Sequence, residues 1–500
     1  MKYIGTRDNI KAVSTIEAIK LGMVPGGGLF IPERIPAISQ KRLHSWINLS
    51  YAQLAQHIFQ LFLANDFSDT ETARIVQQTC HRNNFKTEEI APLVQLDDEL
   101  FILELFHGPT GAFKDIALQA LPHILSLIMK KLSLSNQLLI LVATSGDTGK
   151  AALEGFKNIP GIRVVVYYPY EKVSKIQELQ MLTTEGDNTH VIALEGNFDD
   201  CQNAVKQIFA AQAFNVFLNK QGFELSSANS INWGRLFPQI VYYFSTYLTL
   251  LRNKYIRIEE KINFVVPTGN FGNILAAWYA REMGLPIEKL ICASNINKVL
   301  TDFLNTGVYD VNRPFFSTIS PSMDILVSSN LERFLFEISG RDGKLIAKLM
   351  KGLQDKGRFG LEETLKNKMS DIIFAGYANE AETLNTIKSA YKRHNYLVDP
   401  HTAVGVKVYN DYKNLNTKNI KTVIAGAATP FKFSKAVLSA LLGENSVNNK
   451  EEFVLLQELS EYAKLPIPKM LQDLDKKATK KLSLYPKDKA KQALLELLRI

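Results

Sequence analysis

Residues 138–149 read LLILVATSGDTG, a short apolar run that ends in a polar, glycine-rich turn. A continuous apolar run of this kind is typical of a strand buried on both faces of a sheet. The alanine-rich segment that begins at Lys150 predicts a helix directly after the turn. Strand, turn and helix in this order are the building unit of an α/β fold.

The same unit recurs along the chain in two groups. We predict strands at 138–143, 164–168 and 190–194 with helices at 174–182 and 201–211, then strands at 264–266, 290–293 and 422–425 with helices at 274–283 and 403–412. The first group indicates a small, parallel, doubly wound lobe, and the second group resumes the same α/β alternation. The expected domains are residues 1–95, mainly helical; 96–440, the core, with a smaller mobile lobe at about 138–215; and 441–500, a helical tail. Residues 330–395 read as mainly helical and charged.

The composition is that of a globular protein of two or three domains, with 46% apolar and 22% charged residues among 500. No apolar run reaches the roughly 18 residues that a membrane span needs, and the first residues lack the apolar core of a secretory signal. Cys80, Cys201 and Cys292 are few and widely spaced. They predict reduced thiols in a cytoplasmic protein rather than a disulfide framework or a metal cluster.

The formal net charge of +8 raises the question of a nucleic-acid partner. Much of the excess lies in lysines of the last residues, where aspartates interrupt the run and Tyr485 is the only aromatic residue available for stacking. This pattern favours a solvated helical face. We expect neither a nucleic-acid nor a membrane partner.

A second glycine loop follows the predicted strand at 264–266. It reads Gly269-Asn270-Phe271-Gly272-Asn273 and leads into a helix. Glycines allow successive backbone N–H groups to converge on phosphate oxygens, and the helix start adds its positive end. The loop from Thr144 to Gly149 is built in the same way and suits a carboxylate or a phosphate. For each loop, an ordinary strand-to-helix turn is the alternative.

Lys114 stands behind the turn Gly108-Pro109-Thr110-Gly111 and beside Phe113. An amine that attacks an aldehyde must be partly neutral, which requires burial or a neighbouring cation. The flanking apolar residues make burial plausible, whereas a lone lysine at a helix start is usually solvated. A reactive amine and a phosphate cradle on one chain suggest a lysine-anchored phosphate cofactor, pyridoxal phosphate.

Two further segments carry polar groups. Residues 226–235 hold short polar side chains and Arg235 before an apolar helix, which fits either a phosphate pocket or an elaborate helix cap. His401 is expected at a helix start, in a structural role. The sequence has no metal-ligand cluster and no nucleotide-binding P-loop motif.

Taken together, the motifs resemble threonine synthase along most of the chain. The segments that carry the resemblance are 14–19, 27–32, 108–115, 143–149, 172–177, 227–232, 269–273, 322–325 and 400–404. Each is modest alone, but they occur jointly in the order of that family.

The resemblance implies an α/β fold, that of a fold-type-II pyridoxal-phosphate enzyme similar to tryptophan synthase β. Such a fold has two open sheets, parallel or mixed, flanked by helices, and here an N-terminal, mainly helical domain would precede them. The resemblance also implies a lyase of threonine biosynthesis that converts O-phospho-L-homoserine and water into L-threonine and phosphate, as a monomer or homodimer. Lys114 would bind the cofactor covalently, and its freed amine would move protons at the substrate carbons. The cofactor-binding residues so implied are Lys114, Asp147, Gly269, Asn270, Phe271, Gly272, Asn273 and Thr429. The substrate-binding residues are Thr144, Ser145 and Thr148 for the carboxylate and Ser227, Asn232 and Arg235 for the phosphate.

One segment departs from the family pattern. Relatives commonly carry Thr-Ala-(His/Ser)-Pro-x-Lys-Phe, whose threonine faces the pyridine nitrogen, but here Ala427 stands in its place and Thr429 follows two residues later. Either Thr429 reaches the nitrogen, or water replaces the contact, or the ring electronics differ. Two rival functions therefore stay open: a phospho-lyase that releases 2-oxobutyrate, and a non-catalytic ligand sensor on the same scaffold.

Overall fold

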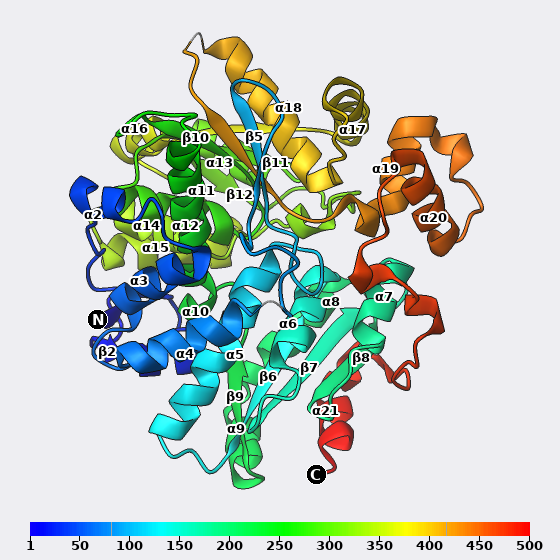
Figure 1. Cartoon of the computed structure of the whole chain (residues 1–500). Helices are drawn as coiled ribbons and strands as arrows, with labels where there is room; N and C mark the ends of the chain where they lie inside the picture. Colours follow the sequence, from blue (N-terminus) through cyan, green and yellow to red (C-terminus); the bar gives the residue numbers. More distant parts are fainter. Residues whose placement is uncertain (82, 417) are drawn as a thin grey trace.

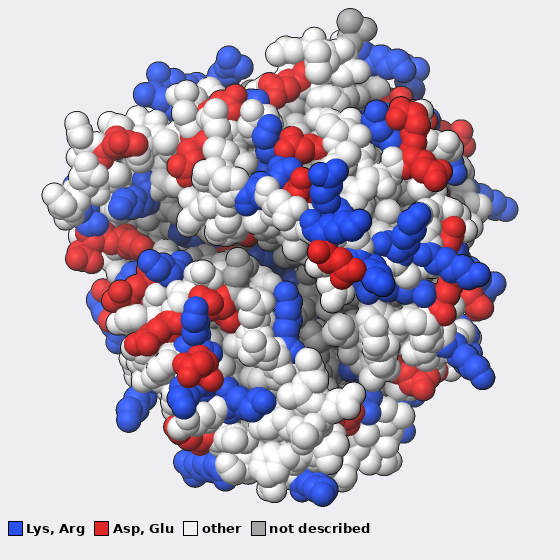
Figure 2. Space-filling view, turned by 180° about the vertical axis from the view of Figure 1, so that it is seen from behind, with Lys and Arg blue, Asp and Glu red and all other residues white. Residues whose placement is uncertain are grey.

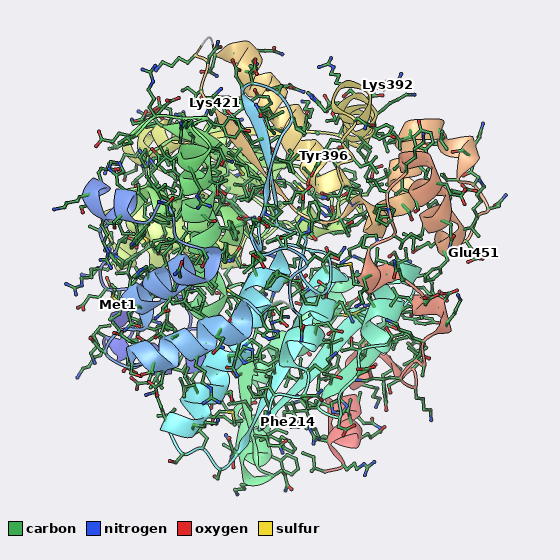
Figure 3. The ribbon with its side chains drawn as sticks, in the orientation of Figure 1. Met1, Phe214, Lys392, Tyr396, Lys421 and Glu451 are labelled. Carbon is green, nitrogen blue, oxygen red and sulfur yellow. The ribbon has the colours of Figure 1, made fainter. Side chains whose placement is uncertain are left out.

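The computed structural model describes residues 1–81, 83–416 and 418–500. For Asp199 it describes the backbone but not the side chain. Two lobes, each built on an open sheet, meet across the middle of the molecule (Figure 1). Phe214 lies near one end of the molecule and Lys421 near the other (Figure 3). Seen from behind, the surface is hollowed where the lobes meet, with Lys and Arg side chains beside the hollow (Figure 2).

The larger lobe contains a six-stranded mixed sheet. Its strands, in spatial order, are β14 (Ile373–Tyr377), β11 (Ile287–Ser294), β10 (Ile262–Pro267), β15 (Thr422–Gly426), β5 (Leu100–Glu104) and β4 (Leu93–Gln95). All neighbours pair in parallel except β4, which runs antiparallel to β5. The central strand β10 is buried along its whole length, as the apolar run at 264–266 predicts.

The smaller lobe contains a five-stranded sheet in which every pairing is parallel. Its strands, in spatial order, are β16 (Leu484–Pro486), β8 (Thr189–Glu195), β7 (Ile162–Pro169), β6 (Gln137–Ala143) and β9 (Phe223–Ser227). The carboxyl ends of β6 and β10 both carry the glycine loops predicted above. An open parallel sheet binds its ligands at such ends.

Helices surround both sheets. Those up to the end of the smaller lobe are α1 (Thr15–Leu21), α2 (Gln40–Ser45), α3 (Tyr51–Leu63), α4 (Asp69–Thr79), α5 (Lys114–Lys131), α6 (Asp147–Phe156), α7 (Lys175–Leu182), α8 (Phe198–Ala210) and α9 (Gln212–Lys220). Serine caps set several starts: Ser14, Ser50 and Ser68 each accept from the backbone three residues on, in a reciprocal capping box.

The remaining helices are α10 (Trp233–Leu236), α11 (Ile240–Arg252), α12 (Gly272–Glu282), α13 (Val299–Thr306), α14 (Leu331–Ile338), α15 (Gly343–Lys356), α16 (Glu363–Ile372), α17 (Glu380–His394), α18 (Pro400–Leu415), α19 (Ser434–Leu442), α20 (Glu452–Ala463) and α21 (Ala490–Leu498). Two small sheets complete the fold: β1 (Lys2–Gly5) with β2 (Val13–Ser14) and β3 (Phe30–Pro32), and β12 (Val308–Asp310) with β13 (Arg358–Gly360). No helix in the described part of the chain is long and apolar enough to cross a membrane.

The predicted fold class is confirmed, and each predicted strand and helix occurs within a few residues of its expected bounds. The differences are strands that the sequence did not announce. Within 330–395, β14 extends the large sheet, and within the tail, β16 extends the small one. A strand of three residues, such as β16, is too short to show alternation, and only its partner strand specifies it. The domain limits remain predictions.

The tail also contributes to the apolar core of the smaller lobe. In α21, Leu494 is fully buried and packs in one cluster with Leu139, Val165 and Ile192 of the sheet. In Figure 1, α21 lies beyond the lower end of β8, next to the C-terminus. Residues 484–498 therefore belong to the packed structure of the smaller lobe, through the pairing of β16 and the apolar contacts of α21.

Replacing Leu494 with alanine should lower the free energy of unfolding by about 2–5 kcal/mol, because a buried leucine leaves a cavity that relaxes only partly. Denaturant unfolding followed by circular dichroism measures this. Leu482→Ala, in the same tail but exposed, should change the free energy by less than about 0.5 kcal/mol. Equal effects of the two substitutions would show that the tail does not pack as described.

Candidate active site

A cavity of about 340 Å³ lies between the two lobes. Both glycine loops line it: Ser145 and Thr148 from the smaller lobe, and the backbone of residues 268–273 from the larger. Lys114 and Arg235 are the two cations among its inner lining, while Lys206 of α8 is exposed at its edge. The cavity thus brings together most of the residues predicted for the site.

The amine of Lys114 faces this cavity. The side chain is half-buried, and its Nζ donates to Ser322 Oγ at 3.0 Å. Burial is the main reason that the pKa of this amine falls from 10.5 to about 8. The nearby charges of Arg235 and Lys432 lower the pKa further, and the negative charge of Asp147 raises it only in part. At pH 7 about a tenth of such an amine is neutral, compared with roughly one part in 3,000 at a pKa of 10.5.

The turn before Lys114 is closed by its neighbour Asp115. This buried carboxylate accepts from Thr110 N at 2.9 Å and from Thr110 Oγ1 at 2.7 Å. Burial raises its pKa to about 6, against the effect of the Thr110 bonds. A Cβ on Gly108 would lie 2.4 Å from Asp115 Cβ, so the turn requires glycine there.

The same turn is tied to the segment that follows β15. Phe113 N donates to Ala427 O at 2.8 Å, and Thr429 N donates to Gly111 O at 3.0 Å. Gly111 has a φ of +74°, which glycine adopts without strain. The lysine loop therefore has a fixed place beside residues 427–429, which are far away in the sequence.

The loop after β10 is arranged to accept an anion. Its carbonyl groups are already bonded: Ser328 Oγ donates to Gly269 O at 2.7 Å, and Asn330 Nδ2 donates to Asn270 O at 2.9 Å. In contrast, the backbone N–H groups of residues 269–273 have no acceptor among the described residues. They are grouped at the start of α12, where the helix dipole favours negative charge.

Two tyrosines fix the end of this loop. Tyr242 OH and Tyr243 OH donate to Asn273 Oδ1 at 2.6 and 2.5 Å. Phe271 precedes α12 in the left-handed conformation, with a φ of +61°. Asn273 is therefore a support for the loop, and its side-chain oxygen is occupied.

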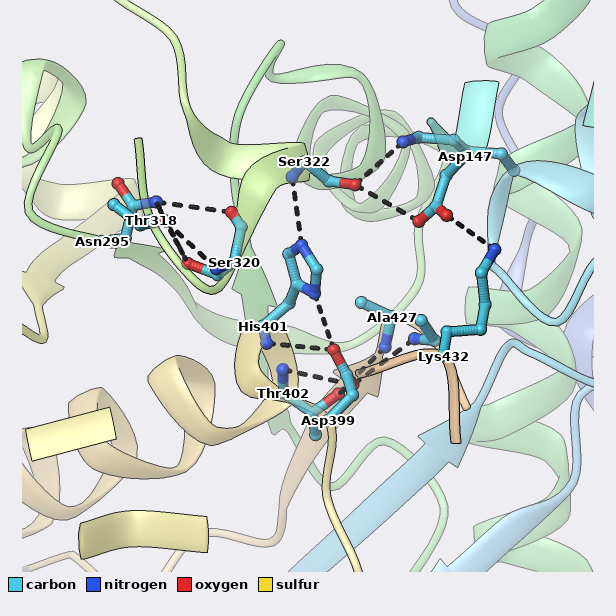
Figure 4. Close-up of polar contacts among 12 residues, drawn as sticks. Asp147, Asn295, Thr318, Ser320, Ser322, Asp399, His401, Thr402, Ala427 and Lys432 are labelled. Carbon is cyan, nitrogen blue, oxygen red and sulfur yellow. Dashed lines mark hydrogen bonds and ion pairs between the residues drawn. The ribbon is translucent and has the colours of Figure 1, made fainter. Parts of the chain in front are cut away.

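Asp147 lies in a buried polar cluster beside the lysine rather than in the cavity lining. Its Oδ1 accepts from Lys432 Nζ at 2.6 Å, and its Oδ2 accepts from Ser322 Oγ at 3.4 Å (Figure 4). Gln177 Nε2 also donates to Oδ1, at 3.0 Å. Burial by itself would raise the pKa of this carboxyl group, but Lys432 and Lys114 outweigh it and hold the pKa well below its usual range. Asp147 is therefore an anion at neutral pH.

The loop after β6 places hydroxyl groups in the cavity. Thr144 Oγ1 accepts from Gly146 N and Gly149 N at 2.9 and 2.8 Å, and so supports the start of α6. Ser145 and Thr148 line the cavity, and their hydroxyl groups have no partner among the described residues. These two side chains are free to bind a ligand.

The structure separates the three residues predicted for a substrate phosphate. Arg235 is buried in the cavity wall, donates to Ala228 O at 2.9 Å, forms no ion pair among the described residues and leaves its Nε without a partner. Burial lowers its pKa to about 10, so it remains charged. Asn232 caps α10 and bonds to Ile19 O and Ser227 O, and neither Asn232 nor Ser227 lines the cavity.

Ala427 lines the cavity, but Thr429 does not. The methyl group of Thr429 packs against Gly111, and its backbone N–H pairs with the same residue. Neither residue offers a hydroxyl group to the cavity lining in this arrangement.

Several residues of the site have no separate signal in the sequence. His401 does follow the start of α18, but the cap is Asp399, and the imidazole of His401 turns into the cavity lining. Ser322, Lys432 and Gln177 meet Asp147 from three distant segments. In the sequence, these residues are marked only by lying within or near the segments that resemble the family.

Comparisons with known proteins identify the family of the chain. The family profile described as "Threonine synthase N terminus" matches residues 2–80, "Pyridoxal-phosphate dependent enzyme" matches 85–356, and "Threonine synthase, C-terminal" matches 402–489. The chain is 39% identical to a threonine synthase of Pseudomonas aeruginosa over 444 residues, which is 89% of this chain and 91% of that protein.

It is also 42% identical over 435 residues to "Threonine synthase-like 1" of Homo sapiens, which covers 85% of this chain but only 58% of that longer protein. Among solved structures, the crystal structure of pyridoxal-phosphate-bound threonine synthase from Brucella melitensis superimposes with a TM-score of 0.88. It has 35% sequence identity and coverage of 100% of this chain and 99% of that one.

Residues 269–273, here called the phosphate loop, contain two glycines that should respond differently to substitution. A Cβ on Gly272 would be at least 3.5 Å from its neighbours, so Gly272→Leu should preserve folding while its side chain fills the cradle and weakens cofactor retention. A Cβ on Gly269 would lie 2.6 Å from Ser322 O, so Gly269→Ala should lower the melting temperature. Cofactor absorbance after dialysis and thermal unfolding measure the two effects. Full cofactor occupancy in Gly272→Leu would place the phosphate elsewhere.

Proposed function

Because the chain belongs to the threonine synthase family of pyridoxal-phosphate-dependent enzymes, we propose that it converts O-phospho-L-homoserine and water into L-threonine and phosphate. One observation carries the proposal. A partly neutral lysine amine, a loop of free backbone N–H groups and an unpaired buried arginine share one cavity. An enzyme that handles a phosphorylated cofactor and a phosphorylated substrate needs all three.

The residues present fit pyridoxal phosphate. The free N–H groups of residues 269–273 would hold its phosphate, and Lys114 would bind its aldehyde carbon. Asp147, as an anion close to that lysine, is our candidate for the group facing the ring hydroxyl. When bound, the cofactor supplies an electron sink that stabilises negative charge on the substrate carbons.

Lys114 is then the group that moves protons. Once the substrate amine has displaced it, the neutral amine of Lys114 would take the proton from Cα, release that proton within the site, and then take one from Cβ, after which phosphate would leave from Cγ. Water would then add at Cβ. Of the three protons released from Cα, Cβ and water, one would go to Cγ, one back to Cα and one to the departing phosphate, which gives threonine. A pKa of about 8 suits this work, because both protonation states are available near neutral pH.

Two sets of side chains would orient the substrate. The unpartnered hydroxyl groups of Ser145 and Thr148 are candidates for the carboxylate, at the start of α6, with Thr144 supporting their loop. Arg235 is the candidate for the phosphate, because a buried guanidinium without a carboxylate partner is stabilised by a doubly charged ligand. Ser227 and Asn232 lie behind it and would act only through Arg235's loop.

The cavity is bounded by both lobes, and α8 of the smaller lobe contributes Phe198, Gln202 and Lys206 to its edge. We propose that the lobes approach each other on substrate binding, because a reactive intermediate needs a site closed to all but one water molecule. We also propose a cytoplasmic location, supported by the three free cysteines. A monomer or homodimer remains a prediction of the sequence.

A phospho-lyase that releases 2-oxobutyrate is the second candidate. One observation favours it: Ala427 lines the cavity at the position where the family pattern has a threonine. Loss of one neutral hydrogen bond to the cofactor ring is worth about 1 kcal/mol, which is enough to change the partition between two products.

Purified protein incubated with O-phospho-L-homoserine should release phosphate and threonine in equal amounts. Amino-acid chromatography and a phosphate assay measure the two products, and Lys114→Ala is the control that should form neither. Phosphate with 2-oxobutyrate and no threonine would establish the phospho-lyase instead. A bound cofactor without phosphate release would indicate the ligand sensor.

Arg235→Met should reduce kcat/KM for O-phospho-L-homoserine at least about 100-fold while the cofactor stays bound. The free energy of unfolding should be unchanged or higher, because the substitution removes an unpaired buried charge. Arg333→Met is the matched control. Arg333 is equally buried, lies outside the cavity and donates three hydrogen bonds, so its loss should destabilise the fold. Full activity of Arg235→Met would remove this residue from the substrate site.

A further inference from the structure

Ser322 stands between the lysine and the buried carboxylate. Its Oγ accepts from Lys114 Nζ at 3.0 Å and lies 3.4 Å from Asp147 Oδ2, to which it donates (Figure 4). Lys114 and Asp147 form no direct ion pair among the described contacts. The serine hydroxyl group therefore links the ammonium group of Lys114 to the carboxylate of Asp147.

The segment that carries Ser322 is held by a buried network on one side. Asp324 Oδ1 accepts from Asn295 Nδ2 and Thr318 Oγ1, each at 2.7 Å, and Asp324 Oδ2 accepts from Thr318 N at 2.8 Å. Asn295 also donates to Ser320 Oγ at 3.0 Å. These bonds fix residues 318–324 independently of any ligand.

A histidine holds Ser322 on the other side. Ser322 N donates to His401 Nε2 at 3.1 Å, and His401 Nδ1 pairs with Asp399 Oδ1 at 2.7 Å (Figure 4). Since the backbone N–H can only donate, Nε2 must be the acceptor and Nδ1 carries the proton. Asp399 also accepts a hydrogen bond from the hydroxyl group of Thr402. The same hydroxyl oxygen accepts from Ala427 N at 3.0 Å.

The phosphate loop adds a third restraint. Ser322 O would lie 2.6 Å from a Cβ on Gly269, so the two backbones pack directly against each other. Ser322 thus touches the lysine, the carboxylate and the loop of free N–H groups at once. A residue with no task other than loop structure would not need its hydroxyl group aimed at the amine.

We propose that Ser322 is a positioning residue for Lys114. Its hydroxyl group accepts from the amine and donates to Asp147, and Asp399 and His401 fix the backbone that carries it. The role rests on the proposed function, because it is the freed amine of Lys114 that must stay in one place while it moves protons. Ser322 sets both the orientation of this amine and its affinity for a proton.

The electrostatic consequence follows from the groups that face the amine. These are Asp147 and Asp115, which favour its charged form, and Arg235 and Lys432, which disfavour it. The Ser322 hydroxyl group favours the charged form by accepting from it and by linking it to Asp147. Without the hydroxyl group, the ammonium form loses an acceptor and its link to Asp147, and the pKa of Lys114 falls.

The test titrates Lys114 in the full-length chain freed of cofactor. Trace acetylation between pH 6 and 10, read by mass spectrometry of the peptide that contains Lys114, gives the pKa of the amine. Ser322→Ala should lower this pKa by about one unit, and Ser322→Thr, which keeps the hydroxyl group, should stay near the wild-type value. Because this readout needs neither substrate nor turnover, it stands even if the reaction proves to be the phospho-lyase one.

Ser320→Ala is the matched control. Ser320 lies on the same segment and its hydroxyl group bonds to Asn295 rather than to Lys114, so the pKa of Lys114 should not move. Ser322→Cys, with nearly the volume of serine and a weak acceptor, is the second variant should Ser322→Ala fail to fold, and it should also lower the pKa. An unchanged pKa in the folded variant at position 322, or an equal fall in Ser320→Ala, would overturn the proposal.

Discussion

The buried ion pair between Lys432 and Asp147 is the contact on which the arrangement of the site depends. The two side chains are 0% and 3% exposed and their atoms are 2.6 Å apart. Removing two charges from water is costly, and the attraction between them compensates only when further hydrogen bonds satisfy both groups. Gln177 and Ser322 supply these bonds to Asp147, and Thr110 O accepts from Lys432 at 3.1 Å. Each of these partners comes from a different segment, so the pair fixes the smaller lobe, the lysine turn and the segment after β15 in one geometry.

Two cations at the cavity have no direct anionic partner among the described residues. Lys432 is matched by Asp147, but Arg235 has no ion-pair partner among the described residues, and Lys114 reaches Asp147 only through a serine. The free N–H groups of residues 269–273 add further positive potential. A buried cation without a direct partner is stabilised when an anion binds beside it. A site that takes a phosphorylated cofactor and then a phosphorylated substrate accounts for these two unpaired cations, whereas a site for neutral ligands does not.

The sequence predicts those parts of the molecule that are specified locally. The apolar runs that became β6 and β10, and the glycine loops that follow them, combine buried strands with turn residues within a dozen positions. Pairings between distant segments leave no such trace. The residues around β16 do not predict its pairing with β8, because β8 lies almost three hundred residues earlier in the chain. Likewise Ser322 and Lys432 become site residues only because the fold brings them to Asp147.

The polar segment at residues 226–235 shows that residue types alone do not distinguish a binding site from a helix cap. Asn232 and Arg235 were predicted together because short polar side chains and an arginine suit a phosphate, but the same residues suit a helix start equally well. In the fold, Asn232 uses its amide for Ile19 O, Ser227 O and Gly234 N, so it has little capacity left for a ligand. Arg235 uses one nitrogen for Ala228 O and keeps Nε free. The distinction between a structural and a binding residue therefore lies in which donors the protein leaves unused, and only the three-dimensional arrangement determines that.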